Sequence, residues 1–503
     1  MPTINTFTPA IPRLATSPDS SDPTGDEWPM FRGALNHTGV AITTPQQGTG
    51  PLWSYTTGAD IWSSPAITGG RLYVGSNDNT MYCLNASTGA VIWSTLTSDW
   101  IHSSPAVAGD RVYFGNDNNN IYCLNATNGT RIWNYTTISG SVGSSPAIAG
   151  GRVYVGSYGL EMYCLNATTG TNLWQLTTAG DTDGSPAVAS GRVYVGSGDR
   201  KMYCLNATTG NTLWTYTAGG FLSFNAPAVA DGRVYVGSND GNLYCINATS
   251  GTYLWSYYTS DFTSVESSPA VQNDRVYFGC TNFKYYCLNA VTGSLYWNYT
   301  TGGFVQSSAA LSGGRIYIGS VDHNMYCLDA TTGAFIWSYG TAGGIVSSPA
   351  IANGRVYFGS MDHKIYCLPM IMPPSAPQNL QANNNTGLIQ LSWQAPRGNG
   401  GLPISSYKIH RGNSSGQLTY LASVNDTTTT YTDSNTTRGS IYYYTVRAVN
   451  GAGEGVQSNE ASATITSTTT PPIPGYHIGI VIGILAFGVA AMLFSIRRRI
   501  SHF

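Results

Sequence analysis

Residues 63–94, SSPAITGGRLYVGSNDNTMYCLNASTGAVIWS, decide the fold of this chain, because the stretch recurs along the sequence with little change. It holds four short apolar runs, SSPAI, RLYVG, MYCLN and AVIWS, separated by Gly, Asn, Asp and Thr. The runs are rich in Val, Ile, Tyr and Trp, which favour β-strands, and the spacers favour turns. No helical period is present. Each copy is therefore predicted to be a small antiparallel sheet.

Three markers keep the copies in register at a period of about 40 residues. An arginine opens the second apolar run of each copy, and a cysteine follows 12 residues later. The arginines are Arg71, Arg111, Arg152, Arg192, Arg233, Arg275, Arg315 and Arg355. The cysteines are Cys83, Cys123, Cys164, Cys204, Cys245, Cys287, Cys327 and Cys367. A tryptophan follows the first seven cysteines, as Trp93, Trp133, Trp174, Trp214, Trp255, Trp297 and Trp337.

Four strands in each repeat of about 40 residues are typical of a propeller blade, so eight copies predict an all-β, eight-bladed β-propeller. The eighth copy stops at Leu368 without its tryptophan, whereas LWSY at residues 52–55 precedes the first copy. This N-terminal strand is expected to complete the last blade. Such a closure would remove two open sheet edges.

The recurring cysteines are interpreted as small buried apolar residues between blades. Neighbouring sheets stack about 10 Å apart, whereas a disulfide needs Cα atoms within roughly 7 Å. No CxxC or Cys/His spacing typical of a metal site is present, so no metal site is predicted.

The blade motif, aromatic-Cys-Leu-Asn-Ala-x-Thr-Gly-x-x-x-Trp, resembles the pyrroloquinoline-quinone (PQQ) type repeat of quinoproteins, and Asp329 keeps the Asp common in that family. WPMFRGALNHTG, residues 28–39, is similar to the lead-in of its secreted members. The resemblance implies either a quinone-dependent dehydrogenase or a non-catalytic scaffold similar to the outer-membrane assembly factor of Gram-negative bacteria. The dehydrogenases' adjacent cysteine pair and calcium ligands have no recognisable counterpart. No catalytic residues, cofactor or enzymatic activity are therefore predicted.

Residues 376–466 resemble a fibronectin type III domain through LSWQAP, PISSYKI and YYYTVRAVNGAGEG. The resemblance implies a β-sandwich in which Trp393 lies in the core and Tyr442 bonds to upstream backbone.

The C-terminal part of the sequence predicts a membrane anchor. Residues 467–477 read as a Thr/Pro stalk, and residues 478–496 are uncharged and apolar, long enough as a helix to span a bilayer of about 30 Å. Arg497, Arg498 and Arg499 follow, which favours a cytoplasmic tail at residues 497–503. The order PGY, apolar segment, arginines also resembles archaeal C-terminal sorting signals of the PGF-CTERM type. Residues 1–30 contain no apolar region typical of a signal peptide, which leaves the export route open.

The composition disfavours nucleic acid as a partner. Charged residues make up 10% of the chain, against roughly 25% in an average soluble protein. The 23 basic and 25 acidic side chains give a net charge of −2, so no broad cationic surface exists for phosphates.

The two faces of the predicted propeller differ in sequence. On the first face, the positions just before each inner strand vary from copy to copy: Trp62, His102, Gly143, Asp183, Phe224, Glu266, Gln306 and Val346. A mixed aromatic, acidic and amide ring predicts a binding site formed by Trp62, His102, Asp183, Phe224, Glu266 and Gln306, with drift in unconstrained loops as the alternative. On the second face, five near-identical turns carry glycosylation sequons, at Asn85, Asn125, Asn166, Asn206 and Asn247. Asn-Ala-Thr-Thr-Gly is also a good turn without any sugar.

These observations favour a membrane-anchored, single-pass cell-surface protein with extracellular domains, which binds a protein or glycan in adhesion or envelope organisation. The alternatives are an exported quinone-dependent oxidoreductase and a scaffold for envelope protein assembly. The predicted order is a disordered segment (1–27), the propeller (28–368), a linker (369–375), the fibronectin type III domain (376–466), the stalk (467–477), the transmembrane helix (478–496) and the tail (497–503).

Overall fold

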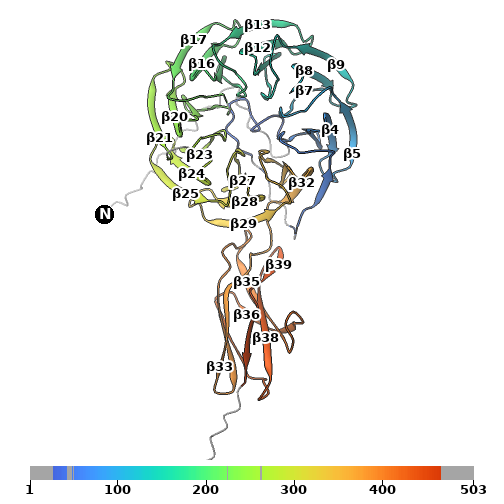
Figure 1. Cartoon of the computed structure of the whole chain (residues 1–503), viewed down its shortest axis with the longest axis vertical. Coiled ribbons are helices and arrows are strands. Elements are labelled where there is room, and N and C mark those ends of the chain that lie inside the picture. Colours follow the sequence, from blue (N-terminus) through green and yellow to red (C-terminus); the bar gives the residue numbers. More distant parts are fainter. Residues whose placement is uncertain are drawn as a thin grey trace, which may run out of the picture. The chain divides into compact units, whose positions relative to one another are not determined.

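The computed structural model describes residues 27–41, 43, 48, 50–223, 225–260 and 263–465, and every regular element in these residues is a β-strand. The chain forms two compact units. In the first unit, four-stranded sheets follow one another around a ring (Figure 1). The prediction of an all-β propeller followed by a fibronectin type III domain is confirmed.

The ring residues form eight four-stranded sheets, here called blades and numbered from the first complete repeat. Blade 1 contains β2 (Ala66–Thr68), β3 (Arg71–Gly75), β4 (Thr80–Asn85) and β5 (Val91–Leu96), and blade 2 contains β6 (Ala106–Ala108), β7 (Arg111–Asn116), β8 (Asn120–Asn125) and β9 (Arg131–Thr136). Blade 3 contains β10 (Ala147–Ala149), β11 (Arg152–Gly156), β12 (Glu161–Asn166) and β13 (Asn172–Thr177), and blade 4 contains β14 (Ala187–Ala189), β15 (Arg192–Gly196), β16 (Lys201–Asn206) and β17 (Thr212–Thr217). Blades 5 to 7 contain β18 (Ala228–Ala230), β19 (Arg233–Gly237), β20 (Asn242–Asn247), β21 (Tyr253–Tyr258); β22 (Ala270–Gln272), β23 (Arg275–Gly279), β24 (Lys284–Asn289), β25 (Leu295–Thr300); and β26 (Ala310–Ser312), β27 (Arg315–Gly319), β28 (Asn324–Asp329), β29 (Phe335–Gly340). Blade 8 contains β30 (Ala350–Ala352), β31 (Arg355–Ser360), β32 (Lys364–Pro369) and, from the N-terminal side, β1 (Trp53–Thr56).

Strand β1 completes blade 8 by antiparallel pairing with β32, in the register Trp53 to Cys367 and Ser54 to Tyr366. This pairing confirms the predicted closure by the N-terminal strand. It places Trp53 where blades 1 to 7 have the tryptophan of their fourth strand, because those tryptophans also pair with the repeat cysteine, as Trp93 does with Cys83.

The recurring tyrosine, arginine and tryptophan of the repeat are explained by their hydrogen bonds to one turn of the next blade. The hydroxyl of Tyr73 and the indole Nε1 of Trp93 in blade 1 both donate to the carbonyl oxygen of Ala126 in blade 2, at 3.1 Å each. The guanidinium of Arg71 donates to the same carbonyl and to that of Thr127. The ring of Trp93 also lies where a Cβ on Gly129 would meet it at 2.6 Å, which is why the turn ends in glycine.

A second set of contacts surrounds the central axis. One residue before each inner strand, a serine in every blade but blade 5, takes part in a series of bonds between blades. In seven of the eight steps its backbone N–H donates to the serine hydroxyl of the next blade, at 2.9 to 3.0 Å. The series runs through Ser64, Ser104, Ser145 and Ser185, resumes at Ala226, and continues through Ser268, Ser308 and Ser348 back to Ser64. Ala226 has no hydroxyl, so the N–H of Ser185 is the one N–H of the series without a hydroxyl acceptor in the next blade.

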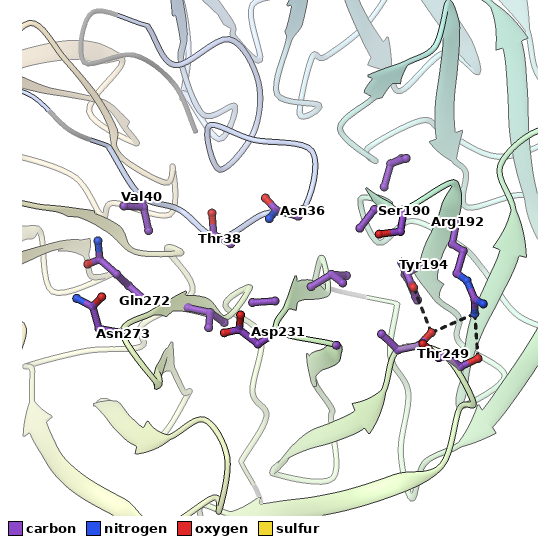
Figure 2. A pocket seen from close by; sticks show the side chains of 17 residues that line it. Asn36, Thr38, Val40, Ser190, Arg192, Tyr194, Asp231, Thr249, Gln272 and Asn273 are labelled. Carbon is purple, nitrogen blue, oxygen red and sulfur yellow. Dashed lines mark hydrogen bonds between the residues drawn. The ribbon is translucent and has the colours of Figure 1, made fainter. Parts of the chain in front are cut away.

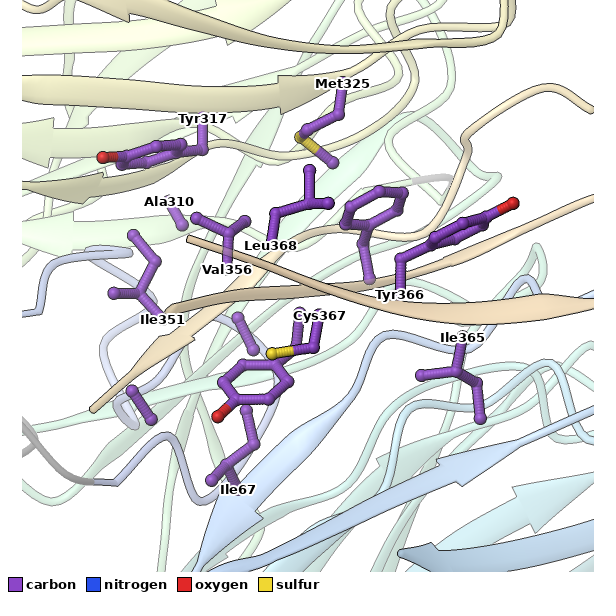
Figure 3. Packing of buried hydrophobic residues seen from close by; sticks show 14 of the residues in the cluster. Ile67, Ala310, Tyr317, Met325, Ile351, Val356, Ile365, Tyr366, Cys367 and Leu368 are labelled. Atoms are coloured by element: carbon purple, nitrogen blue, oxygen red, sulfur yellow. The ribbon is translucent and has the colours of Figure 1, made fainter. Parts of the chain in front are cut away.

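The apolar core lies between adjacent blades. In one cluster, Cys367 and Val356 of blade 8 are buried together with Tyr317 of blade 7 and Ile67 of blade 1 (Figure 3). All nine cysteines are buried and free, which confirms their interpretation as small apolar residues. Burial raises the pKa of the Cys83 thiol to about 11, so the thiol stays protonated at neutral pH.

The N-terminal segment, residues 28–41, runs along the inner strands close to the second face. Trp28 forms an isolated antiparallel bridge with Ile67, and the segment then accepts a backbone hydrogen bond from an inner strand in several blades. The donors are Val107, Val188, Val229, Val271 and Leu311. Arg32 and His37 of this segment are buried, and burial lowers the pKa of Arg32 to about 10. The sequence does not predict this path, because the segment resembles no blade strand.

The fibronectin type III domain contains a sheet of β33 (Gln378–Asn385), β34 (Leu388–Gln394) and β37 (Thr430–Asp433). Its other sheet has β36 (Thr419–Asn425), β35 (Ile404–Gly412), β38 (Ile441–Asn450) and β39 (Gly453–Gln457), and β40 (Ala461–Thr464) pairs with β38. Trp393 is 5% exposed, and the Tyr442 hydroxyl accepts a hydrogen bond from the upstream N–H of Thr437 at 3.1 Å. Both predicted roles are confirmed.

Several predictions lie outside the described residues. They are all but the last residue of the disordered segment predicted at residues 1–27, the stalk at residues 467–477, the transmembrane helix at residues 478–496 and the tail at residues 497–503. In the part of the chain that the structure describes, no helix is long and apolar enough to span a membrane.

Candidate functional site

The first face of the propeller is formed by two sets of loops: those that enter each inner strand and the hairpins between the second and third strands. The predicted binding residues that the structure describes lie in the entering loops, each four residues before its inner strand begins. Repetition of the blade therefore brings them round one opening. Phe224 is outside the described residues.

Blades 1 and 2 bring three aromatic rings together on this face. The ring centroid of Trp62 lies 5.0 Å from that of His102, and the centroid of Trp100 lies 5.7 Å from His102 on another side. The Nδ1 atom of His102 lies 3.2 Å from a carboxylate oxygen of Asp117. Trp62 is 44% exposed and Trp100 50% exposed, so both indoles offer a surface to a ligand.

Asp183 forms the acidic part of the same face. One of its carboxylate oxygens accepts hydrogen bonds from the N–H groups of Gly143 at 3.1 Å and Ser144 at 3.0 Å. Burial, and secondarily the negative charge of Asp181, raise the pKa of Asp183 to about 7. The charge of this carboxylate therefore changes close to neutral pH. Burial, and secondarily the negative charges of Asp183, Asp181 and Asp117, raise the pKa of the half-exposed Tyr158.

The remaining predicted residues form a separate pair. The amide Nε2 of Gln306 donates to a carboxylate oxygen of Glu266 at 2.7 Å, which joins blades 6 and 7. Val346 of blade 8 is partly buried. The structure thus groups Trp62 and His102 with two neighbours that sequence reasoning missed, Trp100 and Asp117. Trp100 lies two residues before His102 in the same loop, and Asp117 lies in the hairpin that follows β7.

The two faces carry opposite charges. Most described carboxylates of the propeller lie in loops of the first face, whereas the recurring arginines open the second strand of each blade at the second face. The first-face carboxylates are Asp60, Asp78, Asp99, Asp117, Asp181, Asp183, Asp199, Asp240, Glu266, Asp322 and Asp362. The first face also exposes apolar side chains, namely Trp62, Trp100, Ile138, Tyr158, Leu160, Phe221, Phe283 and Phe304. It is therefore both acidic and rich in aromatic surface.

The second face contains a pocket of about 580 Å³ between the N-terminal segment and blades 4 to 6 (Figure 2). Sequence reasoning did not find this pocket. Its wall includes Asn36 and Thr38, whose position over the inner strands is fixed by backbone hydrogen bonds. The hairpins of blades 4 to 6 depart from Gly-Gly, but those of blades 2 and 8 do so too, so the sequence alone does not single out this place.

The five sequon asparagines all have a structural task in their turns. The side-chain oxygen of Asn85 accepts hydrogen bonds from the N–H groups of Ser87 and Thr88, and Asn125, Asn166, Asn206 and Asn247 do the same in their own copies. Asp329 and Asn289, which are not part of a sequon, make the same contacts. The turn alone thus explains an acceptor at this position, and glycosylation stays a prediction.

Among the residues that the structure describes, no group of three or more His, Cys, Asp or Glu side chains is placed to hold a metal ion.

Comparison with known families matches the repeats and the C-terminal domain separately. The model of the family described as "Outer membrane protein assembly factor BamB" matches residues 38–185, 161–309 and 299–407, and that of the fibronectin type III domain matches residues 375–464.

Solved structures share the propeller fold at low sequence identity. BamB from Moraxella catarrhalis is 20% identical with a TM-score of 0.57, covering 65% of this chain and 100% of that structure. Quinohemoprotein alcohol dehydrogenase from Comamonas testosteroni is 14% identical with a TM-score of 0.61, covering 73% of this chain and 84% of that one. At such identities the likeness shows the fold alone.

Curated relatives match only a short part of the chain. Exoglucanase B of Cellulomonas fimi is 36% identical over 103 residues, which is 20% of this chain, and amylopullulanase of Thermoanaerobacterium saccharolyticum is 33% identical over 106 residues, which is 21%. The chain spans 8% of the length of each of these relatives.

Proposed function

The chain belongs to the PQQ-type repeat family described as outer membrane protein assembly factor BamB, and from this premise we propose that it is a non-catalytic binding scaffold of the cell envelope. In this proposal the ring has eight blades, and its first face binds a partner. The chain is anchored through residues 478–496 with its propeller and fibronectin type III domain outside the cell. Support for the anchor comes from the apolar segment and the arginines after it.

One observation underlies the proposed binding role: exposed indoles and carboxylates meet on the first face. The rings of Trp62 and Trp100 both lie against the ring of His102, whose imidazole pairs with Asp117. Asp183 adds a further carboxylate on the same face. Aromatic surface next to carboxylates favours a cationic group, because the ring face attracts a cation and the carboxylate pairs with it. Large aromatic residues are also the side chains that most often dominate the binding energy of protein interfaces.

The partner we favour is therefore a protein that presents a basic segment. An acidic face attracts such a segment at long range and fixes its orientation. A neutral glycan is the competing partner, since indoles also stack on sugars. The two differ in salt dependence, because binding of a basic segment weakens as salt screens the charges, whereas stacking of a neutral sugar does not.

The experiment is a capture of envelope proteins and glycans with the full-length chain, repeated with Trp62→Ala and with Tyr253→Ala. Tyr253 is 52% exposed on the outer strand β21, so its replacement is a matched control for loss of an exposed aromatic ring. We expect Trp62→Ala to lose the captured partner and Tyr253→Ala to keep it. The residues Trp62, Trp100, His102 and Asp117 are called the first-face cluster. Equal capture by the native chain and Trp62→Ala would show that this cluster is not the binding site.

The quinone-dependent alternative is tested on the same material by adding pyrroloquinoline quinone with calcium and recording absorbance and alcohol oxidation. Turnover of an alcohol would replace the scaffold proposal with an enzymatic one.

A further inference from the structure

The pocket on the second face is distinct from the first-face cluster and has a lining that the other blades lack. It is enclosed by the N-terminal segment on one side and by the inner hairpins of blades 4, 5 and 6 on the other (Figure 2). Its volume of about 580 Å³ lies within the range of roughly 300–1,000 Å³ typical of small-molecule sites.

Three hairpin residues at this pocket adopt a left-handed backbone conformation that favours glycine. They are Ser190 with φ of 50°, Asp231 with φ of 48° and Asn273 with φ of 51°. At the same hairpin position, blades 1, 2, 3 and 7 have Gly69, Gly109, Gly150 and Gly313. Asn and Asp are common in such hairpin turns. What is particular to blades 4 to 6 is that three adjacent hairpins bring polar side chains to the wall of one pocket. Asn353 of blade 8 shares the conformation but does not line the pocket.

The N-terminal segment adds two hydrogen-bond acceptors to the opposite wall. The side-chain oxygens Oδ1 of Asn36 and Oγ1 of Thr38 are buried and have no hydrogen-bond partner within the protein. Their main chain is held in place, since the carbonyl oxygens of Asn36 and Thr38 accept from the N–H groups of Val229 and Val271 at 2.9 and 3.1 Å. A ligand with hydroxyl groups would satisfy both acceptors once the two side chains rotate toward the pocket, while the main chain stays in place.

The rest of the lining is amide, hydroxyl and aliphatic. Gln272 and Asn273 supply amides, and valine side chains supply apolar surface. The guanidinium of Arg192 already donates to the carbonyl oxygens of Ala248 and Thr249, at 3.3 and 2.9 Å (Figure 2). The polar groups therefore suit a neutral ligand rather than an anion.

We propose that this pocket binds a neutral carbohydrate of one or two sugar units. Sugar hydroxyls would donate to Asn36 and Thr38 and exchange hydrogen bonds with Ser190, Asp231 and Asn273. The C–H face of the sugar ring would lie against the valines that line the pocket, namely Val40, Val188, Val229 and Val271.

The test uses the full-length chain in a buffer free of sugar-based detergent, with maltose and cellobiose as probes and saturation-transfer NMR as readout. The variant is the triple replacement Ser190→Gly, Asp231→Gly and Asn273→Gly, which gives blades 4 to 6 the glycine that blades 1, 2, 3 and 7 have. Glycine relieves the left-handed backbone, so the variant is expected to unfold at the same or a higher temperature. Asn353→Gly makes the same change outside the pocket and serves as control.

We expect saturation transfer to at least one disaccharide with the native chain and with Asn353→Gly. The triple variant should bind it at least about tenfold more weakly, since the hydrogen bonds to the sugar are lost. Absence of transfer to both sugars with the native chain overturns the proposal. Equal transfer with the folded triple variant overturns it as well, because the hairpin side chains would then serve only their turns. Neither result bears on the first-face cluster, whose variants are measured separately.

Discussion

The hydroxyl of Tyr357 in blade 8 donates a hydrogen bond of 3.2 Å to the carbonyl oxygen of Ala86 in blade 1. The same contact joins Tyr73 to Ala126, one blade further along the chain, at 3.1 Å. The junction between the last and first blades is therefore built like the junction between consecutive blades. Trp53 reinforces it, because its indole Nε1 donates to the carbonyl of Ala86 at 3.0 Å.

Deletion of residues 51–57 is expected to lower the unfolding temperature sharply. The deletion removes β1, opens the edge of β32 and takes away the indole that packs on blade 1. The single replacement Trp53→Ala isolates the side chain, and we expect it to cost about 3–5 kcal/mol, as for other buried aromatic residues. Differential scanning calorimetry of both variants measures the effect. An unchanged transition in the deletion variant would show that the ring does not depend on this strand.

The serine series around the axis predicts a stabilising replacement. Ala226→Ser would supply the hydroxyl that the N–H of Ser185 lacks as an acceptor, and we expect about 1 kcal/mol of added stability. Ser104→Ala is the opposite change, since it leaves the N–H of Ser64 without its acceptor. We expect that change to cost about 1–2 kcal/mol. Chemical denaturation of the two variants checks both signs, and a loss of stability in Ala226→Ser would contradict the series.

The repeat predicted the propeller and its closure because side chains mark them: tyrosine, arginine and tryptophan all bind one turn of the next blade. The N-terminal segment could not be predicted, since its hydrogen bonds use the backbone and leave no pattern in the sequence. The first-face cluster was predicted in part. The loops of Trp62, His102 and Asp183 vary visibly, but the approach of Trp100 and Asp117 depends on how two adjacent loops fold together. The second-face pocket could not be predicted, because its wall combines the N-terminal segment with three blades that are far from it in the sequence.

Acid should weaken the attachment of the N-terminal segment through His37. Burial, and secondarily the charge of Arg32, lower the pKa of His37 to about 3, against about 6.5 in the unfolded chain. The folded state thus binds fewer protons between these values, and its stability falls as pH falls from about 6.5, by at most about 1.4 kcal/mol for each pH unit. His37→Asn, which tolerates the left-handed backbone at φ of 56°, should remove this component. Unfolding free energies between pH 4 and pH 8 provide the measurement, and parallel pH profiles of the two proteins would contradict it.

The raised pKa of Asp183 changes stability with pH in the opposite direction to the lowered pKa of His37. It should also make the binding of a basic partner depend on pH. Its pKa of about 7 lies above the usual value of about 3.9, so the folded state binds the extra proton, and this stabilising contribution is lost as pH rises from about 4 to about 7. In Asp183→Asn the amide oxygen can still accept from the N–H groups of Gly143 and Ser144, so the loop should keep its shape while the titration disappears.

The native protein should bind a lysine-rich peptide more tightly at pH 8 than at pH 6, because the carboxylate is charged at the higher pH. The variant should bind about fivefold more weakly at pH 8, as for loss of an ion pair of about 1 kcal/mol. His102 pairs with the carboxylate of Asp117 on the same face, so His102→Gln measured in parallel separates the contribution of that pair. Calorimetric titration at both pH values decides the matter: if Asp183→Asn keeps the pH dependence of binding, the charge that the peptide senses belongs to another group.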